Sequence, residues 1–304
     1  MKRPDPVLEA LDALRDAADV APFLRNRSHR VVAKAAGMQA ATAKDLVEAF
    51  RRLLPGGAKS DPGCVAKLAI VKALIEREDP AAEVYFSGAR HVQLEASWGE
   101  PVDTAAELRG VGVIGLARMA HREALFEAVK LLSDKEAETR IGALRALADS
   151  GNADAELVLR FKADSGDRKP EVMGECFAAL LRLGPKSRAV SFVAGFLEHR
   201  NQETAEGAAI ALGESRMAEA WHVLRDAFER SSVQSAILLG MSLLRNDEAI
   251  EFLFGQIEHG RERAAVSAID ALSSYRGDSV LRERMERIVG KSAALRKAYQ
   301  DTWG

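Results

Sequence analysis

The stretch Arg140-Ile141-Gly142-Ala143-Leu144-Arg145-Ala146-Leu147-Ala148-Asp149-Ser150 decides the fold, because close variants of it recur along the chain. Each variant contains a leucine near its end, and these leucines lie 31, 33, 32, 31 and 29 residues apart along the chain. Near-equal spacing of this kind is typical of a repeat architecture built from one supersecondary unit. The leucines in question are Leu116, Leu147, Leu180, Leu212, Leu243 and Leu272.

Each unit contains two helical patterns rather than strands. In the quoted unit, Ile141, Leu144 and Ala148 follow one another at steps of three and four, which is helical spacing. Breakers such as Gly184-Pro185 and Arg276-Gly277-Asp278 separate the helices. A single helix pair cannot bury its apolar face alone, so stacked pairs must share one core. The sequence therefore predicts an all-α fold, an α-α superhelix (solenoid) of about eight helix pairs.

One interval in the series is too long. Leu74 precedes Leu116 by 42 residues, and we assign the excess to an insertion. Residues that favour strands flank Ser87-Gly88, so a short hairpin and an ordered loop are both open interpretations. Thr104-Ala105-Ala106-Glu107 matches a capping box and predicts the start of the next helix. We expect a single solenoid over 1–304, with N-terminal repeats in 27–79, the insertion in 80–102, regular repeats in 103–290 and a cap or tail in 291–304.

Two of the repeats carry a family resemblance. Each has an acidic or polar helix start followed by a run of small residues and leucine: Asp134…Arg140…Ala143-Leu144…Leu147 and Asn201…Gly207-Ala208-Ala209…Leu212. This pattern resembles the HEAT-repeat family, particularly its short bacterial form, over about residues 28–290. The resemblance implies that the second helix of each pair lines a concave face. It implies little about function, because one fold hosts many functions. The repeat at 231–244 departs from the family's charged ladder, with Ser232 and Gln234 where a charged pair is expected.

Composition narrows the class of protein. The chain of 304 residues is 47% hydrophobic and carries 43 Lys and Arg against 45 Asp and Glu, a net charge of −2. Two cysteines, Cys64 and Cys176, are too few for a disulfide framework or a cysteine-based zinc site. There is no apolar run of about 18 residues and no apolar signal core, so we expect a cytoplasmic protein without membrane contact. The near-zero charge disfavours nucleic acid as a partner.

The motifs that suggest chemistry fail their structural context. Gly110-Val111-Gly112-Val113-Ile114-Gly115 matches the dinucleotide-binding pattern, but that pattern requires a preceding strand, and here the glycines fall inside a helix. They indicate close helix packing instead. The six histidines form no metal-ligand pattern. HEAT-like deoxyhypusine hydroxylases bind metal through His-Glu pairs, and this sequence has no His-Glu dipeptide. We therefore predict no catalytic residues, no metal and no cofactor.

The insertion is the best candidate for a binding surface, since loops on a rigid scaffold often carry function. Our hypothesis is that it projects from the solenoid, and the alternative is that its aromatic residues merely pack the loop against helices. The candidate partner-binding residues are Tyr85, Phe86, Arg90, His91, Gln93, Glu95 and Trp98 in the insertion, with Arg140 and Arg145 on the presumed concave face.

These features favour a non-enzymatic scaffold that binds a protein or peptide through the solenoid surface. Two alternatives stay open on the same architecture. One is a HEAT-like nucleic-acid-binding or DNA-glycosylase-type module, favoured only by the basic surplus in 1–60, where eleven Lys and Arg face seven Asp and Glu. The other is an enzyme similar to the chromophore lyases. The basic residues concerned are Arg25, Arg27, Arg30, Lys34, Arg51 and Arg52.

Overall fold

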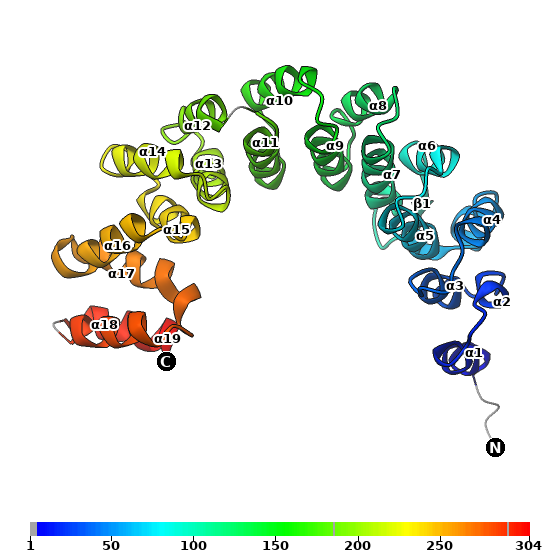
Figure 1. The fold of residues 1–304 in the computed structure, drawn as a ribbon, viewed down its shortest axis with the longest axis horizontal. Coiled ribbons are helices and arrows are strands. Elements are labelled where there is room, and N and C mark those ends of the chain that lie inside the picture. Colours follow the sequence, from blue (N-terminus) through cyan, green and yellow to red (C-terminus); the bar gives the residue numbers. More distant parts are fainter. Residues whose placement is uncertain (1–4, 185, 291) are drawn as a thin grey trace. The chain divides into compact units, whose positions relative to one another are not determined.

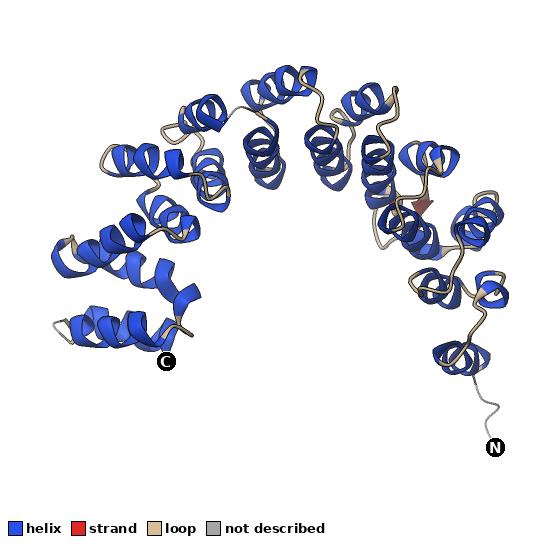
Figure 2. Cartoon of the chain, in the orientation of Figure 1, coloured by secondary structure: helices blue, strands red, loops and turns tan. Residues whose placement is uncertain are grey.

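The computed structural model describes residues 5–184, 186–290 and 292–304. These residues form nineteen α-helices, three short 3-10 helices and one two-stranded hairpin (Figure 2), so the fold is all-α, as the repeat pattern predicts. Among the helices described, none combines the length and apolar character needed to cross a bilayer. The chain divides into two compact units, Met1–Val158 and Leu159–Gly304, and the division falls inside one helix. That the two units build one continuous solenoid stays a prediction.

The first unit consists of stacked helix pairs. The helices α3, α5, α7 and α9 pack in sequence to form one layer, and α2, α4, α6 and α8 lie on the other side of them (Figure 1). The elements are α1 (Pro6–Arg15), α2 (Ala21–Leu24), α3 (His29–Ala36), α4 (Ala43–Leu53), 3-10 turns Gly57–Lys59 and Pro62–Cys64, α5 (Val65–Glu76), α6 (Ala82–Ala89), β1 (Leu94–Glu95), β2 (Val102–Asp103), α7 (Ala106–Arg118), α8 (Ala124–Leu131) and α9 (Ala137–Asp149).

The second unit repeats this arrangement, with α11, α13, α15 and α17 packed in sequence as one layer. The final helix α19 packs on α17, where Trp303 is buried and donates its indole N–H to the carbonyl of Ile269 at 3.2 Å. The elements are α10 (Asp154–Ser165, which carries the division), α11 (Pro170–Leu183), α12 (Lys186–Ala194), α13 (Gln202–Glu214), α14 (Ala218–Phe228), α15 (Gln234–Leu244), α16 (Asp247–His259), α17 (Glu262–Leu272), a 3-10 turn Ser273–Tyr275, α18 (Ser279–Val289) and α19 (Ala293–Trp303).

The repeated leucines occupy equivalent places in the core. They lie toward the C-terminal ends of α7, α9, α11, α13, α15 and α17, one helix from each pair. Five of the six are at most 1% exposed, and at the remaining position Leu243 is partly buried beside the buried Leu244. Burying a leucine side chain contributes about 2 kcal/mol, so this one position in each repeat stabilises the stack substantially.

The glycines of α7 bring helix backbones into direct contact. A Cβ atom added to Gly142 of α9 would lie 2.2 Å from the Cα of Gly110. On the other side of α7, a Cβ on Gly112 would lie 2.5 Å from a backbone nitrogen of α6, and one on Gly115 would lie 2.6 Å from the Tyr85 ring. These distances leave no room for a side chain. The interpretation of the glycine motif as a helix-packing surface is confirmed.

The insertion differs from the expected one. Residues 80–102 do not form a single loop or hairpin, because α6 occupies the first half and Ser87-Gly88, expected at a turn, lie inside that helix. Val84, Tyr85 and Ala89 are buried, and this packing outweighs the modest preference of Val84 and Tyr85 for strands. The hairpin comes later, at 94–103. The inserted residues therefore separate the two helices of one pair, α6 and α7.

The prediction that residues 104–107 form a capping box is also wrong. Helix α7 begins at Ala106, and its cap residue Ala105 makes no side-chain hydrogen bond to the helix. Thr104 ends the hairpin instead, and its hydroxyl donates to Glu95 Oε1 at 2.7 Å. The Ala105 N–H is bound by Asp103 Oδ1 at 3.0 Å. The Thr104 hydroxyl, which the local sequence predicts as a helix cap, forms its hydrogen bond within the hairpin instead.

The substitution Gly142→Ala should destabilise the first unit by about 2 kcal/mol, because the methyl group must push α7 and α9 apart. Urea unfolding followed by circular dichroism measures this loss. Gly255→Ala is the matched control, since Gly255 also lies inside a helix but a Cβ atom added there would meet nothing within 4 Å. It should be neutral or stabilising by up to about 1 kcal/mol. Equal effects of the two substitutions would contradict backbone contact at Gly142.

Candidate functional site

The hairpin between α6 and α7 is the candidate site. Its strands pair in antiparallel register, with Leu94 opposite Asp103 and Glu95 opposite Val102. Four large apolar side chains on this short segment are exposed to solvent, and Trp98 at the tip is fully exposed. The other three are more than half exposed: Val92, Leu94 and Val102. Because residues paired across an antiparallel ladder share a face, Val102 lies on the same face as Glu95, opposite to Val92 and Leu94. We call these four residues, which expose apolar surface on both faces and at the tip of the hairpin, the hairpin patch.

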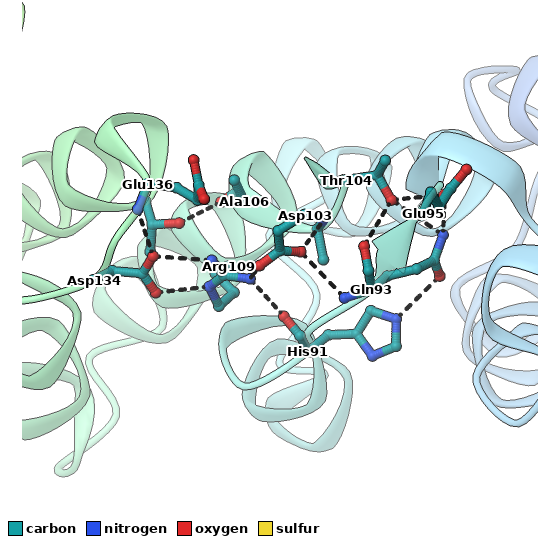
Figure 3. Close-up of polar contacts among 11 residues, drawn as sticks. His91, Gln93, Glu95, Asp103, Thr104, Ala106, Arg109, Asp134 and Glu136 are labelled. Atoms are coloured by element: carbon teal, nitrogen blue, oxygen red, sulfur yellow. Dashed lines mark hydrogen bonds and ion pairs between the residues drawn. The ribbon is translucent and has the colours of Figure 1, made fainter. Parts of the chain in front are cut away.

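The hairpin is joined to the rest of the unit by a buried polar network centred on Gln93, which is only 5% exposed (Figure 3). The Gln93 side-chain amide donates to the carbonyl of Asp61 at 3.0 Å and to Glu95 Oε1 at 2.7 Å. Its oxygen accepts a hydrogen bond from Lys67 Nζ at 2.9 Å. A buried glutamine with all of these bonds satisfied fixes its neighbours in one arrangement. The hairpin is therefore joined directly to α5 and to the turn before it.

The network contains an ion pair with no exposure to solvent. Asp61 and Lys67 are both 0% exposed, and Lys67 Nζ lies 3.5 Å from Asp61 Oδ2. The same carboxylate accepts the backbone N–H groups of Ala66 and Lys67, each at 2.9 Å, and so satisfies free donors at the start of α5. Buried charges are tolerated only when they are paired and hydrogen-bonded, and here both conditions hold.

Glu95 connects the first strand to three partners. Its Oε1 atom accepts hydrogen bonds from Thr104, from Gln93 and from the backbone N–H of Gly63, the last at 2.7 Å. The hydrogen bond from Thr104 makes the largest favourable contribution to a lowered pKa of this carboxyl group. Glu95 is therefore ionised at neutral pH. Its charge holds the hairpin against the turn that precedes α5.

Arg109 fastens the other strand. It is 4% exposed, pairs with Asp103 at 2.7 Å and binds Asp134 through two nitrogens, each at 2.9 Å (Figure 3). A third contact runs to the carbonyl of His91 at 2.9 Å. Burial acts most strongly on this guanidinium and opposes its charge, but Asp134 and Asp103 outweigh it and raise the pKa of Arg109. The hairpin is thus bound to α7 and to the segment before α9.

Arg90 joins the end of α6 to α8. Its guanidinium binds Glu127 through two nitrogens at 3.0 and 2.8 Å and lies 4.8 Å from the centre of the Phe86 ring. Phe86 in turn meets His121 edge-on, with ring centres 4.9 Å apart. The hydrogen bonds from Arg90 lower the pKa of Glu127 to about 2. These contacts are intramolecular, so Arg90 and Phe86 contribute to the anchoring of α6.

The predicted site residues fall into three groups. Trp98 and Arg90 are exposed, while His91, Glu95 and Phe86 are partly buried. Tyr85 and Gln93 are inside, and the Tyr85 hydroxyl donates to the carbonyl of Asp79 at 2.7 Å, so packing explains Tyr85 fully. The structure brings His91, Gln93 and Glu95 together in one network. Arg140 is 9% exposed and donates to the carbonyls of Asp134 and Lys135, whereas Arg145 is exposed on α9.

Several residues of this site were missed by the sequence analysis. The sequence did not indicate the buried Asp61, Lys67 and Arg109 or the partly buried Asp103, although a lysine within the mostly apolar helix Val65–Glu76 was an available signal. The hairpin patch was represented by Trp98 alone. The alternation of Val92 and Leu94 with polar residues was the pattern that could have located the first strand.

The remaining candidates for chemistry are the two cysteines and possible metal ligands. Burial raises the pKa of the Cys64 thiol to about 11 and that of Cys176 to about 12, so both thiols are protonated at neutral pH. Within the part of the chain that the structure describes, no cluster of three or more His, Cys, Asp or Glu side chains is arranged to hold a metal ion.

Much of the N-terminal basic surplus is already paired. Arg51 binds Glu83 through two nitrogens, Arg52 donates to the carbonyl of Leu24 at 2.8 Å, and Arg25 lies 3.8 Å from carboxylate oxygens of Asp45 and Glu48. Such pairing leaves less positive charge available to contact phosphates.

Comparisons with known proteins give no family. No protein-family model matches the chain, and no curated protein is similar to it. Among solved structures, a crystal structure of an engineered protein is 18% identical with a TM-score of 0.43, covering 96% of this chain and 89% of that one. Human deoxyhypusine hydroxylase in complex with glycerol is 15% identical with a TM-score of 0.30, covering 98% of each chain. Similarity at this level carries no functional argument.

Replacing Lys67 by Met should cost about 3–5 kcal/mol of stability, because it leaves the Asp61 carboxylate buried without its cation. Hydrogen exchange should also become faster in 92–104, where Gln93 loses a partner. Lys72→Met is the control on the same helix, since the pair of Lys72 and Glu107 is about half exposed and should contribute less than about 1 kcal/mol. A loss for Lys67→Met as small as the control's would show that the buried pair does not anchor the hairpin.

The stability contribution of Glu127 should depend on pH in a defined direction. Its pKa in the folded state is lowered to about 2, so its contribution is complete above the usual carboxyl pKa and is lost as the pH falls toward 2. The difference in unfolding free energy between wild type and Glu127→Gln should therefore be constant above about pH 5 and shrink below it. Urea unfolding at a series of pH values measures this. The exposed Glu138→Gln serves as control, and a pH-independent difference for Glu127→Gln would contradict the pairing.

Proposed function

We propose that this chain is a non-catalytic interaction module that binds a folded protein partner through the hairpin patch. One observation carries the proposal: Val92 and Leu94 on one face, Val102 on the other and Trp98 at the tip expose apolar surface on a hairpin whose base is fixed by hydrogen bonds and ion pairs. Exposed apolar clusters with a polar surround mark interaction sites, and tryptophan is the residue most enriched among binding hot spots. We also propose that the stacked pairs are HEAT repeats, on the strength of the regular leucine spacing.

The rigidity of the hairpin base supports this function energetically. Association costs free energy for each loop and side chain that must become ordered, and a segment held before binding avoids most of that cost. Gln93, Glu95 and Arg109 hold the base of the hairpin in the free protein. The segment that carries Trp98 is therefore held at its base before any partner binds. The matching partner surface is an apolar cavity large enough to accept an indole ring.

Site-specific photo-crosslinking tests the proposal. A benzophenone amino acid placed at position 98 in host cells should form a discrete adduct with one protein. The same group at position 280 should not, although Val280 on α18 is also an exposed apolar residue. With the purified pair, Trp98→Ala should weaken binding by about tenfold or more, and Val280→Ala by less than about twofold.

Two results would overturn the proposal. The first is the same set of adducts from both positions, which would indicate non-specific contact. The second is unchanged affinity of the purified pair when Trp98→Ala keeps its circular dichroism spectrum and melting temperature, because the indole would then contribute nothing to binding.

A further inference from the structure

In the second unit, helices α11 and α13 pack side by side (Figure 1), and residues of both helices line a groove with an apolar floor. One hollow of about 380 Å³ has a floor of small and apolar residues, formed by Gly174, Gly207, Ile210 and Ala211. A second hollow of about 400 Å³ shares Ala211 and continues the groove with other apolar residues, Ala178, Leu181 and Met217. The missing side chains at the two glycines let a bound chain approach the helix backbones closely.

Carboxylates line this groove. Glu171 lies at the start of α11, Glu203 at the start of α13 and Glu214 at its end, and all three are exposed. Among the described residues, none of these three carboxylates forms an ion pair or a side-chain hydrogen bond. By contrast, Glu206 accepts a hydrogen bond from Gln202, and Glu175 pairs with Arg182 at 3.1 Å. Because Gln202 is neutral, four carboxylates of the groove lack a cationic partner among the described residues, and Arg182, which lines the second hollow, is paired with Glu175.

We propose that this groove binds a short peptide segment that carries lysine or arginine beside an aliphatic side chain. Cations on the segment would pair with Glu171, Glu203 and Glu214, and the aliphatic group would lie on Ile210 and Ala211. Glu203 and Glu214 are eleven residues apart on one helix, so the charges extend over about 16 Å. An extended segment of about five residues spans that length. This surface belongs to the second unit, and its test does not depend on whether the hairpin patch binds anything.

The spacing of the carboxylates favours a peptide over a metal ion. A metal ion needs several ligands that converge on one point, whereas these carboxylates are distributed along two helices. The described residues include no cluster suited to a metal ion here. A chain with charges at intervals and apolar groups between them matches both the charge and the floor of the groove.

Fluorescence anisotropy with synthetic peptides tests this inference on the full chain. The probe is a fluorescein-labelled peptide of about eight residues in which lysine and leucine alternate. Two comparison peptides replace all lysines by glutamate or all leucines by serine. The lysine–leucine peptide should bind, the glutamate peptide should not, and the serine peptide should bind about tenfold more weakly. Binding should also weaken when the salt concentration is raised.

Matched variants locate the site. The triple variant Glu171→Gln, Glu203→Gln and Glu214→Gln should weaken binding of the lysine–leucine peptide by about tenfold or more. The control triple, Glu219→Gln, Glu248→Gln and Glu283→Gln, removes the same charge from exposed positions of the same unit outside the groove and should change affinity by less than about twofold. Ile210→Ser should weaken the leucine-containing peptide and leave the serine peptide unaffected.

Three outcomes would overturn the inference. The absence of measurable binding of the lysine–leucine peptide at low salt is one. Equal weakening by the two triple variants is another, because it would mean that binding follows net charge alone. Equal affinity for the leucine and serine peptides is the third, since the apolar floor would then play no part. Circular dichroism of each variant verifies that the helices are intact.

Discussion

The backbone contact between Gly110 and Gly142 is the constraint on which the candidate site depends. It sets the distance between α7 and α9 at a value that no side chain would allow. Arg109, the residue beside Gly110, can then reach Asp134 in the segment before α9 while it also binds Asp103 in the hairpin. A wider separation would break this bridge. Close helix packing and the buried charges are thus two parts of one arrangement, and the hairpin takes its position from both.

The hairpin reverses the usual distribution of residue types. Charged and amide side chains fill the interior beneath it, while aliphatic and aromatic groups face water. The buried groups keep their place because each has partners: Lys67 meets Asp61 and Gln93, and Arg109 meets two carboxylates. Breaking such a network leaves an uncompensated charge, so the network specifies one arrangement. No comparable requirement holds the exposed apolar groups in place, which is why an external partner is the explanation we favour for them.

The sequence predicted what depends on periodicity. Leucine spacing identified the helix pairs, and the context of Gly110 and Gly112 identified a packing surface. It failed where distant residues decide local structure. In helix α6, Tyr85 packs against Gly115 of α7. The sequence of residues 82–89 alone does not predict that contact. Likewise, Asp61 and Gln93 are 32 positions apart and meet only after folding. A pair of this kind leaves no spacing signal in a single chain, so most of the candidate site was beyond sequence reasoning.

The place of the hairpin within its helix pair has a consequence for evolution and engineering. Because the extra residues join α6 to α7, their tip can lengthen or change composition without altering the stacking of neighbouring pairs. Lengthening a surface loop costs little free energy, since the closure entropy grows only logarithmically with length. Residues 96–101 can therefore be replaced by other sequences while Gln93, Glu95 and Arg109 hold the base of the hairpin. Descendants of this chain can acquire new recognition at the tip, and designers can graft epitopes there, while the scaffold beneath stays unchanged.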